Sequence, residues 1–179
     1  TKVLNQKERE QVIEYSKKLN STNLSPLRSG NISVRGIQDD VEGFFITPSG
    51  KKYENLKLED IVFLSLNEEK DFLSWFNSGK NPSSEWRFHQ DIYKNKWEAK
   101  AIVHAHSPHA TAVSSHREAI PAFHYMIALA GGDDIKCSKY ATFGTNELSL
   151  NIIKALEKRK ACLMSNHGQV AFGKNLSTA

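Results

Sequence analysis

Cysteine, long apolar runs and strong net charge are all scarce in this sequence. It contains only two cysteines, Cys137 and Cys162. Two are too few for a disulfide framework, and we expect both as reduced thiols in a cytoplasmic protein. No apolar run approaches the roughly 18 residues of a membrane span, and the first twenty residues lack the apolar core of a signal peptide. The net charge of +4, from 24 basic and 20 acidic side chains, is too small to predict nucleic-acid binding.

What is present is typical of a globular protein. The chain has 179 residues, of which 39% are apolar and 25% charged. It contains no internal repeat, linker or low-complexity tract. We therefore expect a single domain over residues 1–179. Residues 175–179 resemble the start of one more helix, so we expect the natural chain to be longer.

Periodicity and capping signals predict a mixed succession of helices and strands. The expected helices are 5–20, 83–97, 108–116 and 145–160, and the expected strands are 31–36, 43–48, 60–66, 100–106, 161–168 and 169–173. Pro108 and Thr145 mark two of the helix starts. Residues 68–82 are expected to be irregular or a hairpin. Short strand-to-strand turns favour a mixed or antiparallel sheet covered by helices.

Three histidines crowd the stretch AIVHAHSPHA, residues 101–110. His104 and His106 are two apart at a strand end, so they project from the same face and can bind one zinc ion. His109 follows Pro108 and has left that face, so we do not count it as a ligand. The alternative is a strand end with two solvated or hydrogen-bonded histidines. A catalytic zinc needs a third ligand, and the best candidate is His167, before a turn glycine.

Three short clusters of small hydrogen-bonding residues fall at strand ends, turns or a helix start. They are Gly30 with Asn31, Ser49 with Gly50, and Ser83 with Ser84. Their hydroxyl and backbone donors can together surround a phosphate, although each pair is also an ordinary turn sequence. Glu85 follows the last pair in the expected first turn of a helix, where the helix dipole alone favours an acidic residue.

Seven stretches in this order give the chain a family resemblance. They are SGNISVR, FFITPSG, PSSEWRFH, IVHAHSPHATAVS, PAFHYMIALAGG, YATFGTNELS and SNHGQVAFG. The chain resembles the class II aldolase family from about residue 5 to its end. The resemblance implies an α/β fold in three layers, with a mainly antiparallel central sheet of about nine strands and helices on both sides. It also implies a homotetramer with active sites at subunit interfaces.

The resemblance assigns roles to individual residues. It implies one Zn²⁺, or another divalent transition metal, per subunit, held by His104, His106 and His167. Glu85 matches the fourth ligand, which substrate displaces to become the general base. Tyr125, from the neighbouring subunit, matches a proton donor, and Phe143 an aromatic group on the aldehyde side. The positions that hold the substrate phosphate are matched by Gly30, Asn31, Ser49, Gly50, Ser83 and Ser84. Roles for His89, His109 and His124 stay open.

The implied reaction is the reversible cleavage of L-fuculose 1-phosphate to dihydroxyacetone phosphate and L-lactaldehyde through a metal-stabilised enediolate. The alternatives are other sugar-phosphate enzymes of the superfamily, namely L-ribulose-5-phosphate 4-epimerase and methylthioribulose-1-phosphate dehydratase, or a non-catalytic adducin-like assembly domain. The chain departs from the family pattern at Leu27 and Arg28, which make the loop before Gly30 bulkier, and at Ser49, where relatives often carry Thr. The C-terminal helix and tail of the family are not in this sequence.

Overall fold

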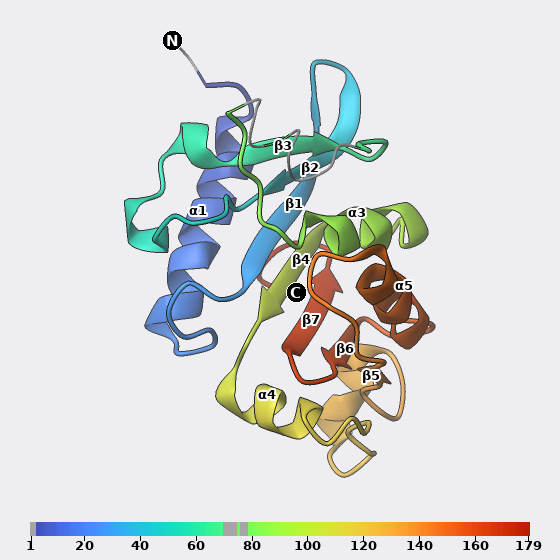
Figure 1. The fold of residues 1–179 in the computed structure, drawn as a ribbon. Helices are drawn as coiled ribbons and strands as arrows, with labels where there is room; N and C mark the ends of the chain where they lie inside the picture. Colours follow the sequence, from blue (N-terminus) through green and yellow to red (C-terminus); the bar gives the residue numbers. More distant parts are fainter. Residues whose placement is uncertain (1–2, 70–74, 76–78) are drawn as a thin grey trace.

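The computed structural model describes residues 3–69, 75 and 79–179. The helices are α1 (Gln6–Ser21), α3 (Trp86–Asn95), α4 (Pro108–Ser114) and α5 (Asn146–Ala155), with short 3-10 helices η1 (Tyr53–Asn55), η2 (Leu58–Asp60) and η3 (Tyr125–Ala130). The strands are β1 (Asn31–Gln38), β2 (Val41–Ile46), β3 (Val62–Ser65), β4 (Ala101–Ala105), β5 (Cys137–Ser138), β6 (Ala161–Met164) and β7 (Gly168–Gly173). Figure 1 shows β1, β4 and β7 side by side near the middle of the molecule.

Across the described residues the strands form one sheet of seven, in the order β3-β2-β1-β4-β7-β6-β5. Every neighbouring pair is antiparallel except β5 and β6, which are parallel. The expectation of about nine strands was therefore wrong, and the sheet is mixed. Between α4 and β5 the chain forms η3 and loops around Gly131 and Gly132 in place of further strands, because this stretch lacks alternating apolar residues.

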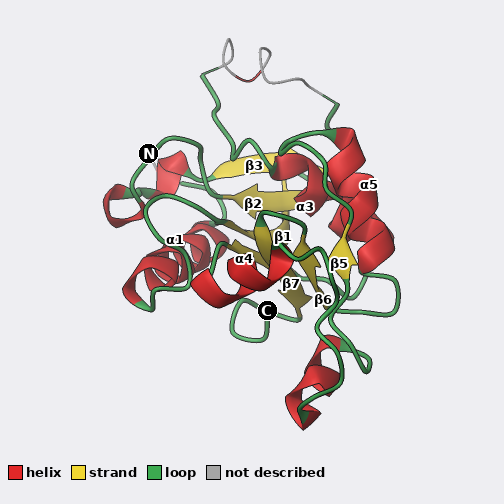
Figure 2. Cartoon of the chain, turned by 60° about the horizontal axis from the view of Figure 1, so that its bottom comes forward, coloured by secondary structure: helices red, strands yellow, loops and turns green. Residues whose placement is uncertain are grey.

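Helices cover both faces of the sheet, as the family resemblance implies. Figure 2 shows α1 on one side and α3 with α5 on the other. Val12 and Leu19 of α1 pack on one face of the sheet in the smaller apolar core. The larger core lies between the other face and helices α3 and α5, and it includes Phe88, Ile92 and Ile152. The expected arrangement in three layers is thus confirmed, with fewer strands than expected.

Most expected helix and strand limits agree with the structure to within a few residues. Thr145 caps α5 by accepting a hydrogen bond from the backbone N–H of Leu148. The helix expected over 83–97 begins only at Trp86, so Glu85 is its N-cap residue and does not lie in the first turn. Most of the irregular segment or hairpin expected over 68–82 lies outside the described residues.

Two expectations, that both cysteines are reduced and that the chain contains no membrane span, can be compared with the structure. Both cysteines, Cys137 and Cys162, are free thiols. None of the helices in the described part of the chain is long and apolar enough to cross a membrane.

Candidate metal and phosphate site

The antiparallel register brings three distant segments to one end of the sheet. Asn31, at the start of β1, pairs with His104 near the end of β4. Gln169, near the start of β7, pairs with Ala105 on the other side of β4. The turn that carries His167 immediately precedes β7 and therefore lies beside the end of β4.

Four potential ligands meet at this end of the sheet. One ligand atom each from Glu85, His104, His106 and His167 lies within 4.8 Å of all the others. The Nε2 atoms of His104 and His106 are 3.0 Å apart. The two carboxylate oxygens of Glu85 divide between neighbours, with Oε2 3.1 Å from Nε2 of His104 and Oε1 3.1 Å from Nε2 of His167. The structure thus brings together the four residues named from the sequence as metal ligands.

Neighbouring groups fix two of the histidines. Nδ1 of His104 donates a hydrogen bond of 2.8 Å to the carbonyl oxygen of Gln169, which turns Nε2 toward the cluster. Ligand histidines are commonly held in this way by a backbone carbonyl. The backbone N–H of His106 donates to Oγ of Ser25, 3.1 Å away. Ser107, next in the chain, exchanges hydrogen bonds with the side chain of Gln169. The end of β4 is therefore held on both sides.

The surroundings favour a neutral imidazole at His106 beside an ionised carboxylate at Glu85. Burial, together with positive charge at His104 and His167, lowers the pKa of His106 to about 4. Burial raises the pKa of Glu85, but positive charge at His104 and hydrogen bonds from His104 and His167 outweigh it and hold that pKa well below the usual range. Neutral histidine and ionised glutamate are the forms that bind a metal.

The placement of one buried atom tests whether these residues fit a metal. Oε1 of Glu85 is buried and lies 3.1 Å from Nε2 of His167. A buried carboxylate is stable only when it is paired or bound to a cation. Zinc with nitrogen and oxygen ligands at about 2.0–2.2 Å would take this oxygen as a ligand and needs donor atoms spaced about as closely as these. The donor set of three imidazoles and one carboxylate therefore fits a divalent transition metal.

The three pairs of small residues line one pocket beside the cluster. This pocket, of about 140 Å³, is lined by Arg28, Ser29, Gly30, Asn31, Pro48, Ser49, Gly50, Lys51, Tyr53, Ser83, Ser84, Glu85 and His106. Gly30 adopts φ of +82° there, and a Cβ at this position would lie 2.6 Å from the carbonyl oxygen of His104. Only glycine lets the loop approach β4 so closely. The pocket adds two cations, Arg28 and Lys51, to the predicted set.

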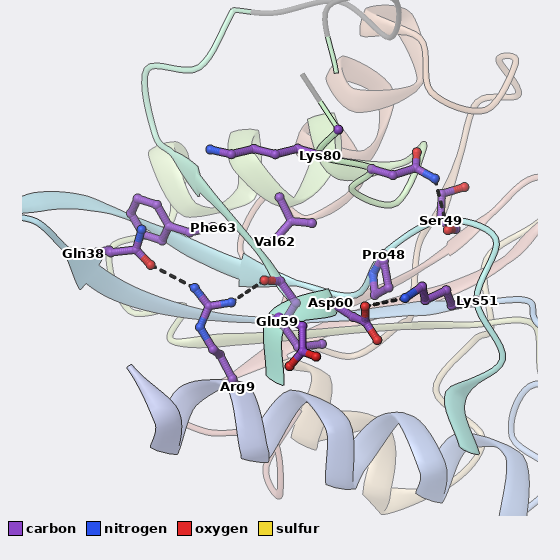
Figure 3. A pocket seen from close by; sticks show the side chains of 13 residues that line it. Arg9, Gln38, Pro48, Ser49, Lys51, Glu59, Asp60, Val62, Phe63 and Lys80 are labelled. Carbon is purple, nitrogen blue, oxygen red and sulfur yellow. Dashed lines mark hydrogen bonds and ion pairs between the residues drawn. The ribbon is translucent and has the colours of Figure 1, made fainter. Parts of the chain in front are cut away.

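The turn that carries Ser49 and Gly50 is held by contacts with neighbouring segments. Ser49 exchanges backbone and side-chain hydrogen bonds with Asn81. Lys51 forms an ion pair with Asp60, which is visible in the second pocket behind this turn (Figure 3). That pocket, of about 320 Å³, contains none of the four clustered ligand residues. Arg28 also donates a hydrogen bond of 3.1 Å to the carbonyl oxygen of Gly50.

A second, wider pocket also adjoins the cluster. It has about 380 Å³ and is lined by Ser84, Glu85, His106, Tyr140, Ala141, Phe143, Asn166 and His167. Phe143, predicted to line the aldehyde side, is one of these residues. Sequence reasoning missed Tyr140 and Asn166, although both lie in motifs that carry the resemblance and Asn166 directly precedes His167.

Three predicted or open residues lie away from the cluster. Tyr125, on η3, is 82% exposed and lines neither pocket at the cluster. His124 caps η3 by accepting a hydrogen bond from the backbone of Met126. His109 is exposed on α4 and is not one of the four clustered residues. In contrast, His89 is completely buried on α3, beside Asn31.

Known proteins resemble the chain in sequence and in fold. Residues 10–179 match the family model described as class II aldolase and adducin N-terminal domain. An L-fuculose phosphate aldolase from Escherichia coli K12 is 46% identical over 94% of this chain and 74% of its own length. A 5-methylthioribulose-1-phosphate/5-deoxyribulose-1-phosphate aldolase from Rhodospirillum rubrum is 42% identical over 94% of this chain and 72% of its own length. A solved L-fuculose 1-phosphate aldolase superposes with a TM-score of 0.84 at 39% identity, over 97% of this chain and 78% of that one.

Proposed function

The chain belongs to the class II aldolase and adducin N-terminal domain family, and on that premise we propose that it cleaves a ketose 1-phosphate reversibly to dihydroxyacetone phosphate and an aldehyde. Its curated relatives are aldolases, which are lyases. The first substrate to test is L-fuculose 1-phosphate, with L-lactaldehyde as the second product. The proposed cation is Zn²⁺, and another divalent transition metal would suit the same donors.

One observation carries this proposal, namely that two pockets adjoin the cluster. The pocket with the predicted phosphate residues and the wider pocket share Ser84, Glu85 and His106, and each has further residues of its own. A ketose 1-phosphate has matching parts, with its phosphate at C1, the carbonyl at C2 and the bond to be cleaved between C3 and C4. Its aldehyde half would then occupy the pocket with Phe143.

Glu85 has the chemistry of the proposed general base. Its carboxylate is buried and its pKa is held well below the usual range, so it is ionised at neutral pH. In the condensation direction we propose that it takes the proton from the carbon that becomes the nucleophile, a step worth about 10²–10⁴-fold in rate. A divalent cation held by His104, His106 and His167 supplies Lewis-acid stabilisation of the negative charge on the substrate oxygens.

The phosphate pocket supplies binding energy away from the reacting carbon. Hydroxyl and backbone donors from Ser49, Gly50 and Ser83 would surround the phosphate, and Arg28 adds a positive charge. Such contacts position the substrate and promote catalysis through binding at a remote group.

Tyr125 is proposed to act across a subunit boundary. It would donate a proton to the alkoxide that forms on the aldehyde. Its exposure in this chain, together with that of Phe123 and Leu129 nearby, supports a contact between this segment and a second copy. The proposed homotetramer is tested by the molar mass of the protein in solution, measured by light scattering. A monomer with full activity would contradict this role.

The choice of aldehyde is the open part of the proposed function. A 42% identical relative is named for 5-methylthioribulose 1-phosphate and 5-deoxyribulose 1-phosphate. These substrates and L-fuculose 1-phosphate share the ketose 1-phosphate head and differ in the aldehyde half. The relative therefore supports 5-methylthioribulose 1-phosphate as a second candidate for the same reaction.

The deciding experiment measures release of dihydroxyacetone phosphate from each of these ketose 1-phosphates. We expect release by the metal-loaded protein, loss of release with a chelator, and recovery when zinc is restored. L-Ribulose 5-phosphate is tested in parallel for epimerisation. Epimerisation without aldol cleavage would favour the epimerase alternative, and a protein that purifies without metal and inactive would favour the adducin-like one.

A further inference from the structure

A buried chain of hydrogen bonds runs from Glu85 into the protein interior. Nδ2 of Asn31 lies 3.0 Å from Oε2 of Glu85. Oδ1 of Asn31 lies 2.5 Å from Nε2 of His89, whose Nδ1 lies 2.7 Å from Oγ of Ser33. Ser33 in turn lies 2.8 Å from the hydroxyl of Tyr93. All five residues are buried, and β1 and α3 supply the four that follow Glu85.

The chemistry of the groups fixes the direction of every bond in this chain. An ionised carboxylate only accepts hydrogen bonds, so the atom of Asn31 that faces Glu85 is the Nδ2 donor. The other amide atom, Oδ1, only accepts, so His89 must donate from Nε2. If His89 is neutral, its Nδ1 is then an acceptor, to which Ser33 donates. The hydroxyl of Tyr93 is left to donate to Ser33.

The surroundings of His89 keep it neutral. Its side chain is fully buried in the layer between the sheet and α3, and its ring stacks on Phe88 with centroids 4.7 Å apart. Burial, with positive charge at His104, lowers the pKa of His89 to about 3. The geometry and the environment therefore agree on a neutral imidazole protonated at Nε2.

We infer that His89 is a positioning residue that orients the general base through Asn31. The Nε2–H of His89 holds the amide of Asn31 in one orientation, and the Nδ2–H₂ of Asn31 then holds Oε2 of Glu85. If the amide flipped, its oxygen would face the carboxylate and repel it. This inference rests on the proposed function for the role of Glu85, and it assigns a task to a histidine that lies outside the four ligands.

A purely structural role for His89 makes a different prediction. In that case the hydrogen-bond chain would only satisfy buried polar groups. Removing His89 would then lower the stability of the protein without altering the chemistry. The two readings are separated by replacing His89 with side chains that keep or remove the Nε2 donor. Glutamine can place its amide nitrogen near the position of Nε2, whereas leucine fills the space without a donor.

The first measurement does not depend on enzymatic activity. Two-bond ¹H–¹⁵N NMR spectra of the metal-loaded wild-type protein report the tautomer of each histidine, and the signal of His89 is assigned from its loss in His89→Gln. We expect a neutral ring protonated at Nε2 from about pH 6 to about pH 8. A ring protonated at Nδ1, or a charged ring, would overturn the inference.

The second measurement compares kcat at saturating substrate. We expect His89→Leu to lower kcat by about 10–100-fold, the usual effect of losing a group behind a ligand. His89→Gln is expected to recover kcat to within about threefold of the wild type, a difference of under about 1 kcal/mol. Ser149→Ala is the matched control, because it removes a partly buried hydrogen bond of 2.5 Å from α5 to Asp91 of α3 without touching the hydrogen-bond chain. A wild-type kcat for His89→Leu, or equal losses for Leu and Gln, would refute the positioning role.

Metal affinity distinguishes failure of this inference from failure of the proposed function. If the wild-type protein cleaves none of the ketose 1-phosphates, the proposed function fails, but Glu85 still faces the three histidines. Chelator competition should then show weaker zinc binding in His89→Leu than in His89→Gln, by about tenfold. Equal affinities in the two variants would overturn the inference by itself.

Discussion

The burial of His89 predicts that acid destabilises the folded protein strongly. Its pKa is about 3 in the folded state, against 6.5 as the ordinary value. Between these two values the unfolded chain binds a proton that the folded chain does not, so the free energy of unfolding falls as pH decreases. Each pKa unit corresponds to about 1.4 kcal/mol, so the whole shift corresponds to about 5 kcal/mol. The part lost between pH 7 and pH 5 is about 2 kcal/mol, a large fraction of a typical stability of about 5–15 kcal/mol.

Urea unfolding at pH 7 and at pH 5 measures this contribution. A chelator is present throughout, so that proton competition for the metal does not add to the result. His89→Gln should lose about 2 kcal/mol less than the wild type between the two pH values, because it lacks the titrating group. His116→Gln, which removes an exposed imidazole, is the matched control and should behave like the wild type. Equal losses in the wild type and His89→Gln would refute the reasoning.

Four further predictions concern the site itself. Glu85→Gln should lower kcat by about 10²–10⁴-fold while the protein stays folded by circular dichroism, and a wild-type rate would leave Glu85 only a helix-start residue. Gly168→Ala would place a Cβ 2.3 Å from the carbonyl oxygen of Ala105 and 3.0 Å from the ring of His106. Because this ring is a proposed metal ligand, the zinc affinity measured by chelator titration should fall about 10–100-fold. Arg28→Gln should raise KM for the ketose 1-phosphate by about 10–100-fold with kcat nearly unchanged, because a charged hydrogen bond to phosphate is worth about 1.5–3 kcal/mol. Tyr125→Phe should lower kcat by about 10²-fold with unchanged zinc content by elemental analysis, and an unaffected rate would contradict its role as proton donor.

The sequence predicted most of the fold because its signals are local. Pro108 and Thr145 mark helix starts that the structure confirms. Two strands joined by a turn were also expected where β6 and β7 lie, although the turn falls at residues 165–167, within the expected strand 161–168. The number of strands was wrong because it came from the family resemblance. Residues 115–136 have no alternating pattern of their own that could have predicted strands there.

The candidate ligands differ in how much the sequence alone could say. His104 and His106 form a pair through strand periodicity, which a single sequence reveals. His167 and Glu85 have ordinary explanations as a turn residue and a helix-start residue. The sequence alone made His167 the best candidate for a third ligand, and the family resemblance assigned both residues their roles. The structure then shows why separate segments can contribute, because the register of β1, β4 and β7 brings them to one end of the sheet.

The contacts behind the site could not be predicted from sequence. Asn31 and His89 are 58 positions apart, and their contact depends on how α3 packs across β1. No periodic pattern marks a histidine whose function is to hold an asparagine. Asn31 itself was predicted only as a phosphate residue, whereas the structure also places its amide against Glu85.

The two pockets beside the cluster differ in exposure, and this difference bears on specificity. The phosphate side is built from buried or hydrogen-bonded groups such as Ser83 and the turn of Ser49. The other side is lined by Tyr140 and Phe143, which are 54% and 62% exposed. Relatives named for different aldehydes would need the same phosphate and metal groups but a different lining for the second product. We therefore expect exchange of Tyr140 or Phe143 to change the ranking of ketose 1-phosphates by kcat/KM, while changes to the phosphate turn lower kcat/KM for all of them alike.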